Sequence, residues 1–127
     1  MTQEEKQLLL KDLCGRLPYG VVIHTWYNGS IDIKCTGIDL YANTINLDIS
    51  KDDDAKVYID NVKPYLRPMS SMTYDESKDY DILIQYDAYH PVNTDLYDWF
   101  NAHYLDYRGL ISMGLALEAS EWMYKTE

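Results

Sequence analysis

The chain has 127 residues, of which 46% are hydrophobic and 25% are charged, and its formal net charge is −10. This length and composition predict one folded domain with its own core and exclude a disordered chain. The excess of acidic residues excludes broad, sequence-independent binding to nucleic acids and to anionic membranes, because both depend on lysine and arginine.

The first predicted element is a helix over residues 2–15. Thr2 and Glu5 have the spacing of a capping box, in which each side chain accepts a hydrogen bond from the backbone of the other residue. Apolar residues then recur at helical spacing. Gly15 and Pro18 end the predicted helix.

Residues 20–68 form a β-rich segment. The runs VVIHTWY and SIDIKC flank the dipeptide Asn28-Gly29, which favours the tight turn of a hairpin. TINLDIS alternates apolar and polar residues, and VYIDNV, which continues through VKPYLRP, is rich in β-forming residues; KDDDAK predicts the turn between them. This order predicts an α+β fold with an N-terminal helix, a small curled antiparallel sheet and C-terminal helices. A barrel of the SH3-like or Sm-like kind is the alternative form of the sheet.

Residues 72–119 form a helix-rich segment, and no linker separates it from the sheet as a second domain. Thr73 and Glu76 repeat the spacing of a capping box and predict a short helix that ends near Tyr80. ILIQY, which follows, has the composition of one more strand.

The strongest helical pattern begins after Asn93 or Thr94, either of which suits an N-cap. Its apolar stripe consists of Leu96, Trp99, Phe100, His103, Tyr104 and Tyr107. Asp106 then begins a second helical turn that Gly114 ends, with LALEA extended after it. A single kinked helix is the alternative.

The two cysteines, Cys14 and Cys35, lack CxxC spacing and are too few for a disulfide framework. The first residues, MTQEEKQLLLKDL, are too acidic and too short in apolar sequence for a signal peptide, and no run has the length of a membrane span. We therefore expect a cytoplasmic protein without membrane association.

Neither a metal nor another cofactor is expected. The acidic run 52–54 lacks the ligand spacing of an EF-hand and predicts a solvated turn. His24, His90 and His103 form no zinc-binding pattern, and His24 lies in a predicted strand as a structural residue.

His103 is the candidate for catalysis. It shares the predicted helical stripe with Trp99 and lies close in sequence to Asp106 and Tyr107, so it has the neighbours that general acid-base chemistry needs. The competing interpretation is a partly buried histidine that is only structural.

The stretch KPYLRP places Lys63, Tyr65 and Arg67 at alternate positions, so that in a strand they point to one face. The prolines Pro64 and Pro68 predict an edge strand, because proline cannot donate to a sheet ladder.

The segment from Pro68 to Tyr107 carries eight acidic residues and one base, Lys78. Two interpretations of the flanking basic residues follow. In the first, Arg67 and Arg108 pair with these carboxylates and tie the C-terminal helix to the sheet. In the second, basic and aromatic residues converge on an anionic ligand, and these are Lys63, Tyr65, Arg67, Tyr107 and Arg108.

The stretches KPYLRPMSSMT and NAHYLDYRGLISMGLALEA, together with the opening MTQEEKQLLLKDLCGRLPYGV, resemble small proteins encoded by gut Bacteroidales, their phages and prophages and other mobile elements. The resemblance covers about half of the chain. It implies a setting, the cytoplasm of a bacterial host, and an accessory role, but no particular chemistry.

Three functions are consistent with these observations. The first is a non-catalytic accessory protein that binds a host protein, which suits an acidic surface rich in tyrosine. The second is an oligomeric sponge that sequesters an anionic nucleotide signal of host defence. The third is a small hydrolase or nuclease that uses His103. An exposed sheet edge would also suit a homo-oligomer.

Overall fold

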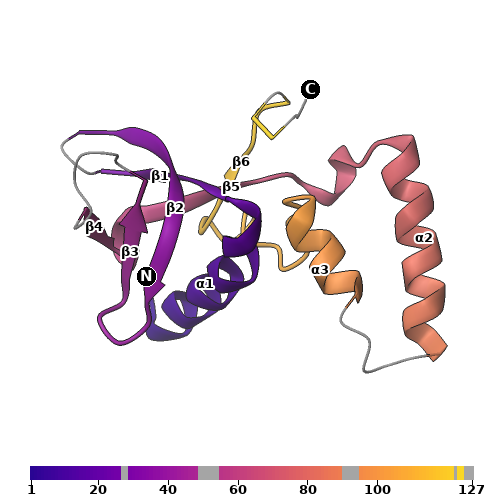
Figure 1. The fold of residues 1–127 in the computed structure, drawn as a ribbon, viewed down its shortest axis with the longest axis horizontal. Helices are drawn as coiled ribbons and strands as arrows, with labels where there is room; N and C mark the ends of the chain where they lie inside the picture. Colours follow the sequence, from indigo (N-terminus) through magenta and orange to yellow (C-terminus); the bar gives the residue numbers. More distant parts are fainter. Residues whose placement is uncertain (27–28, 49–54, 90–94, 122, 125–127) are drawn as a thin grey trace.

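The structure, a computed structural model, describes residues 1–26, 29–48, 55–89, 95–121 and 123–124, with the backbone alone for 86–89. Its helices are α1 (Gln3–Arg16), α2 (Tyr74–Tyr89) and α3 (Asp95–Ala102), and short 3-10 turns η1 (Leu17–Tyr19), η2 (Ile59–Asn61) and η3 (Met69–Ser71) connect elements. Figure 1 shows an elongated molecule with the sheet and α1 at one end, α3 in the middle and α2 at the other end.

The sheet has six strands in the order β4-β3-β2-β1-β5-β6. Five of them pair antiparallel, and β6 pairs parallel to β5. The strands are β1 (Val22–Thr25), β2 (Ile31–Asp39), β3 (Thr44–Leu47), β4 (Lys56–Tyr58), β5 (Val62–Leu66) and β6 (Leu117–Glu118). The order of an N-terminal helix, a mostly antiparallel sheet and C-terminal helices confirms the α+β prediction. The sheet is open, and the described strands do not close into a barrel.

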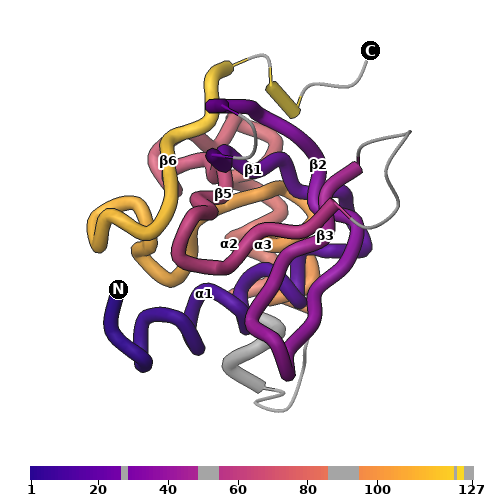
Figure 2. The backbone as a smooth tube through the Cα atoms, turned by 90° about the vertical axis from the view of Figure 1, so that its left-hand side faces the viewer, coloured from indigo at the N-terminus to yellow at the C-terminus, as the bar shows by residue number. Residues whose placement is uncertain are grey.

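The main core lies between the sheet and α1. Leu9 and Leu13 of α1 are fully buried and belong to the same cluster as Ile23 of β1 and Ile45 of β3. Figure 2 views the molecule from the sheet end and shows α1 below β1 and β5. Leu110 joins this core from the segment after α3, so the C-terminal part of the chain completes a core that the N-terminal part begins.

A second, smaller core lies between α2 and α3. Leu96, Phe100 and Leu105 are buried in it, and Tyr80 and Leu83 of α2 pack against them. The aromatic rings of Phe100 and Tyr107, which stack with centroids 4.9 Å apart, belong to the same cluster; a second core therefore orients α2.

Both predicted capping boxes are present. The Thr2 hydroxyl accepts a hydrogen bond from the Glu5 backbone at 3.0 Å, and the Glu5 carboxylate accepts one from the Thr2 backbone at 2.8 Å. Thr73 and Glu76 make the same pair of contacts at the start of α2, at 3.2 and 2.9 Å. At each helix start, side chains thus accept hydrogen bonds from two backbone N–H groups that have no partner within the helix. This is why α1 and α2 begin where the sequence predicts.

The prediction that ILIQY forms a strand is wrong, because α2 continues through it to Tyr89. Tyr80 and Leu83, three residues apart, pack on the second core at helical spacing, while Ile82 and Ile84 remain exposed. The β-branched isoleucines gave the segment the composition of a strand although neither of them lies in the core.

The predicted stripe of the next helix is also too long. α3 ends at Ala102, and Tyr104 adopts a left-handed conformation with φ 59°. The backbone N–H of Tyr104 bonds the carbonyl of Asn101, and that of Leu105 bonds the carbonyl of Phe100, which is the pattern of a Schellman motif. His103, Tyr104 and Tyr107 therefore lie beyond the helix.

The second helical turn predicted after Asp106 forms as a series of turns, not as a helix. The Asp106 carboxylate accepts hydrogen bonds from the backbone of Leu110 and Ile111, at 2.8 and 2.9 Å. Gly114, with φ 76°, ends the turns, and the predicted extension of LALEA is confirmed where β6 pairs with β5.

The prediction of an edge strand at KPYLRP is wrong. β5 lies between β1 and β6, with Pro64 opposite Ile23 of β1 and Tyr65 opposite Leu117 of β6. The partner strand β6 lies more than fifty residues later in the sequence, and no local pattern around Pro64 predicts this pairing. The alternation itself is confirmed, since Val62, Pro64 and Leu66 are buried.

Residues 51–54 of the KDDDAK turn, the caps at Asn93 and Thr94 and part of the Asn28-Gly29 turn fall outside the described residues.

Candidate functional site

The five residues predicted to bind an anionic ligand separate into three groups of interactions. Arg67 contacts α2 and the end of α3, Tyr107 and Arg108 lie near α1, and Lys63 and Tyr65 belong to β5. Tyr107 and Arg108 are joined by a hydrogen bond of 3.1 Å from Arg108 Nη2 to the tyrosine hydroxyl. Convergence of all five on one ligand has no support in these contacts.

Arg67 is engaged by protein groups on α2, on η3 and in the turn that follows α3. Its Nη1 and Nη2 donate to Oε2 and Oε1 of Glu76 at 2.8 and 2.7 Å, a bidentate pair. The same guanidinium donates to the carbonyls of His103 at 3.2 Å and Ser71 at 3.1 Å. These contacts match the first interpretation of Arg67, in which it ties the end of the sheet to the helices.

His103 belongs to the same cluster. Its Nδ1 lies 2.8 Å from Oε2 of Glu76, and its ring centroid lies 4.5 Å from that of Trp99. The pKa of Glu76 falls from its usual 4.5 to about 2, first because Arg67 hydrogen-bonds the carboxylate, with burial opposing. Glu76 is therefore ionised and holds the side chains of Arg67 and His103 in place. This arrangement favours a structural role for His103.

Arg108 pairs with a carboxylate of α1, whereas the first interpretation paired it with the carboxylates of segment 68–107. Its Nε lies 3.2 Å from Oδ1 of Asp12, a fully buried carboxylate that also pairs with the fully buried Arg16 at 2.8 Å. Arg16 Nη2 donates to the carbonyl of Leu105 at 2.7 Å. We call Asp12, Arg16 and Arg108 the buried ion cluster; it fastens α1 to the chain beyond α3. The i,i+4 spacing of Asp12 and Arg16 was the signal available in the sequence.

The outer face of the sheet carries residues whose grouping was not predicted. His24 of β1 pairs across the sheet with Asp32 of β2 on one side and with Lys63 of β5 on the other. Side chains alternate along a strand, and the neighbours Ile23 and Thr25 are buried, so these three lie on the solvent side.

Hydrogen bonds link four side chains there into a chain. His24 Nδ1 lies 2.7 Å from Oδ1 of Asp32, and His24 Nε2 lies 2.8 Å from the hydroxyl of Ser30. The Tyr65 hydroxyl donates to the same Asp32 oxygen at 2.9 Å. We call Ser30, His24, Asp32 and Tyr65 the sheet-face relay.

The strand register explains why the sequence did not reveal the relay. A two-residue turn at Asn28-Gly29 would place Ile33 opposite His24. The observed register places Asp32 there, and Ile33 lies opposite Ile23. A shift of one residue exchanges the two faces of a strand, so the carboxylate comes to the side of the histidine.

The outer side of α2 is the most exposed apolar surface on a helix among the described residues. None of the described α2 side chains is buried, and Tyr74 and Ile82 are 74% and 65% exposed. Tyr74, Lys78 and Ile82 recur every four residues and so form one row on the helix, with the Lys78 ammonium 4.5 Å from the Tyr74 ring centroid. α2 also carries five acidic residues: Asp75, Glu76, Asp79, Asp81 and Asp87.

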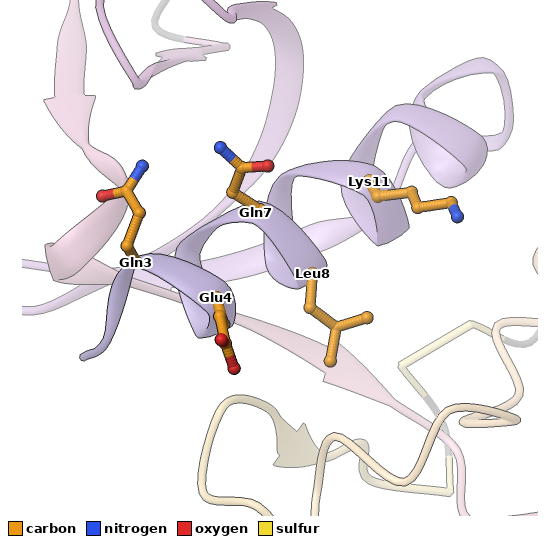
Figure 3. A pocket seen from close by; sticks show the side chains of 5 residues that line it. All are labelled: Gln3, Glu4, Gln7, Leu8 and Lys11. Atoms are coloured by element: carbon orange, nitrogen blue, oxygen red, sulfur yellow. The ribbon is translucent and has the colours of Figure 1, made fainter.

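A shallow groove of about 470 Å³ runs along the outer side of α1 and is lined by Gln3, Glu4, Gln7, Leu8 and Lys11 (Figure 3). A second groove, of about 430 Å³, shares Gln7 and Lys11 and extends to Leu40 and Asn43. None of the residues predicted to bind a ligand lines either groove.

Comparisons with models of protein families, with curated proteins and with solved structures give no match to this chain. Among the described side chains, no group of three or more histidine, cysteine, aspartate or glutamate residues is placed to hold a metal ion. Within the described helices, none combines the length and apolar character needed to cross a bilayer.

Proposed function

We propose that the protein acts by binding a partner protein through the outer side of α2, as an accessory protein of a phage or mobile element in a bacterial cytoplasm. The observation that carries the proposal is the row of Tyr74, Lys78 and Ile82, in which two large apolar side chains are exposed on a helix that packs against α3 on its other side. Figure 1 shows α2 at the end of the molecule, where a partner can approach it. A helix presenting apolar anchors at this spacing is a common docking element.

The charge of α2 indicates the chemistry of the partner. Asp75, Asp79 and Asp81 are exposed against one base, Lys78, and give the helix a negative surface around its apolar row, whereas Glu76 is paired with Arg67. Two copies of this helix would repel each other, whereas a partner with an apolar groove and a basic rim would be attracted. We therefore expect a host protein with a basic surface, and not a second copy of this chain.

The nucleotide-sponge alternative has less support. Arg67 and Arg108, the guanidinium groups that would hold phosphate, are already paired with Glu76 and Asp12. Releasing them would take the bidentate partner from Glu76 and one of two arginines from the buried carboxylate of Asp12, which is costly.

Replacement of Ile82 by glutamate is expected to weaken capture of the partner from a bacterial host lysate by about 30-fold, the loss typical of a hot-spot residue. The physical reason is that a charge replaces an apolar anchor that becomes desolvated on binding. The measurement is quantitative pull-down with the immobilised protein, followed by titration of the captured protein.

Leu40→Glu is the matched control, since Leu40 is 61% exposed, lies between β2 and β3 and lines the second groove of α1. It should change the affinity by no more than about 2-fold, as surface residues outside an interface usually do. A loss with Leu40→Glu and none with Ile82→Glu would contradict the proposal and move the binding surface to α1.

A further inference from the structure

We propose that Ser30 is a nucleophile that His24 activates, which gives the outer face of the sheet an acyl-transfer activity toward small carboxylic esters. This activity is separate from α2 and goes beyond the proposed binding function.

The geometry is that of a serine, a general base and an orienting carboxylate. The Asp32 carboxylate at 2.7 Å fixes the proton of His24 on Nδ1. Nε2 is then left as an acceptor for the hydroxyl of Ser30 at 2.8 Å, within the range that proton transfer requires. The same roles, in this order, define a serine-histidine-aspartate triad, which is recognised by geometry and not by fold.

The relay is built on paired strands. His24 and Asp32 lie directly opposite each other in the β1–β2 ladder, and Ser30 immediately precedes β2. The imidazole of His24 and the indole of Trp26 pack at right angles, with ring centroids 4.9 Å apart. Backbone pairing and ring packing therefore hold the base in one orientation before a substrate arrives.

Tyr65 and Asp32 position the base. The tyrosine hydroxyl donates to the Asp32 oxygen that the imidazole also contacts, at 2.9 Å. Hydrogen bonding by His24 is the main cause that lowers the pKa of Asp32, so the carboxylate stays ionised and keeps its hold on the ring. Lys63 lies opposite His24 in the β1–β5 register.

The reaction has two balanced steps. Ser30 Oγ bonds to the carbonyl carbon of the ester, its proton passes through His24 Nε2 to the departing alcohol, and the bond between carbonyl carbon and alcohol oxygen breaks. Water then attacks the acyl-serine, releases the carboxylic acid and returns a proton to Ser30. The face is open, with Trp26 54% exposed beside the base, so the site suits small esters with an aromatic leaving group that can lie against the indole.

The test treats the whole protein with diisopropyl fluorophosphate, which forms a covalent adduct with a nucleophilic serine and releases fluoride. Peptide mass spectrometry then locates the adduct. We expect the adduct on Ser30 and none in Ser30→Ala, while Ser70→Ala, which removes an exposed serine of η3, labels as the wild type does. Hydrolysis of p-nitrophenyl acetate should be lost in Ser30→Ala together with the adduct.

His24→Ala should lower the labelling rate about 100-fold, the contribution usual for a general base. Added imidazole should restore part of that rate, a response that a purely structural histidine would not show. Asp32→Asn should also lower the rate, and Asp32→Glu should recover part of it at unchanged thermal stability, because the carboxylate orients the base.

Absence of an adduct on Ser30, or an unchanged labelling rate in His24→Ala, would overturn the inference. The two proposals fail separately, since Ile82→Glu should label at the wild-type rate and Ser30→Ala should bind the partner of α2 as tightly as the wild type.

Discussion

Replacement of Asp12 by asparagine is expected to lower the free energy of unfolding by about 3–5 kcal/mol, the usual cost of removing one partner of a buried ion pair. Asp12 and Arg16 are both fully buried, and Arg108 shares the same carboxylate. Asparagine has nearly the same shape but no charge, so the variant leaves two guanidinium groups around a neutral side chain. The measurement is urea unfolding at neutral pH.

Asp60→Asn is the control for this loss. Asp60 pairs with Lys6 at 3.3 Å, and its side chain is 49% exposed. Exposed pairs contribute about 0–1 kcal/mol, so this variant should remain within that range. A loss below 1 kcal/mol in Asp12→Asn would contradict the account of the buried ion cluster as the fastening between α1 and the C-terminal half.

Replacement of Arg67 by alanine should lower the free energy of unfolding by about 3 kcal/mol, because it removes charge-assisted hydrogen bonds and takes the bidentate partner from a half-buried carboxylate. Glu76 loses both contacts of the bidentate pair, and the carbonyls of His103 and Ser71 lose a donor. Arg67→Lys keeps the charge but not the planar fork, so its loss should be intermediate. Equal stability of Arg67→Ala and the wild type would contradict this role.

The dependence of stability on acidic pH gives a second test of the contact between Arg67 and Glu76. The pKa of Glu76 lies near 2 in the folded protein and near 4.5 without its partners. A carboxylate with a lowered folded pKa contributes stability that is complete above the unfolded pKa and is lost as pH falls from about 4.5 toward 2. In Arg67→Ala the main cause of the lowering is gone, so the decline of stability over this pH window should be shallower than in the wild type.

Local signals in the sequence predicted the elements whose causes are local. The capping boxes at Thr2 and Thr73 depend on two residues three apart, and both are present. The alternation of buried and solvent-facing residues in KPYLRP was also predicted, because it follows from the strand conformation alone. The end of α3 depends on Tyr104 in a left-handed conformation, which tyrosine adopts rarely, so composition suggested that the helix continued.

Local sequence patterns did not predict the contacts between residues that are far apart in the sequence. The pairing of β6 with β5 was not predicted, and the cluster around Asp12 joins residues 96 positions apart. For Arg67 the sequence left two interpretations, and the contact with Glu76 supports the structural one. The sheet-face relay depends on a register that differs by one residue from that of a two-residue turn.

Photo-crosslinking from position 82 tests the central claim most directly, namely that the outer side of α2 is the binding surface. A photoreactive amino acid replaces Ile82 in one variant and Leu40 in another, two aliphatic residues exposed to 65% and 61%. In irradiated host cells we predict a covalent adduct with a protein of basic surface from position 82 and none from position 40. Adducts from position 40 alone, or an adduct of twice the mass of this chain from position 82, would contradict the account.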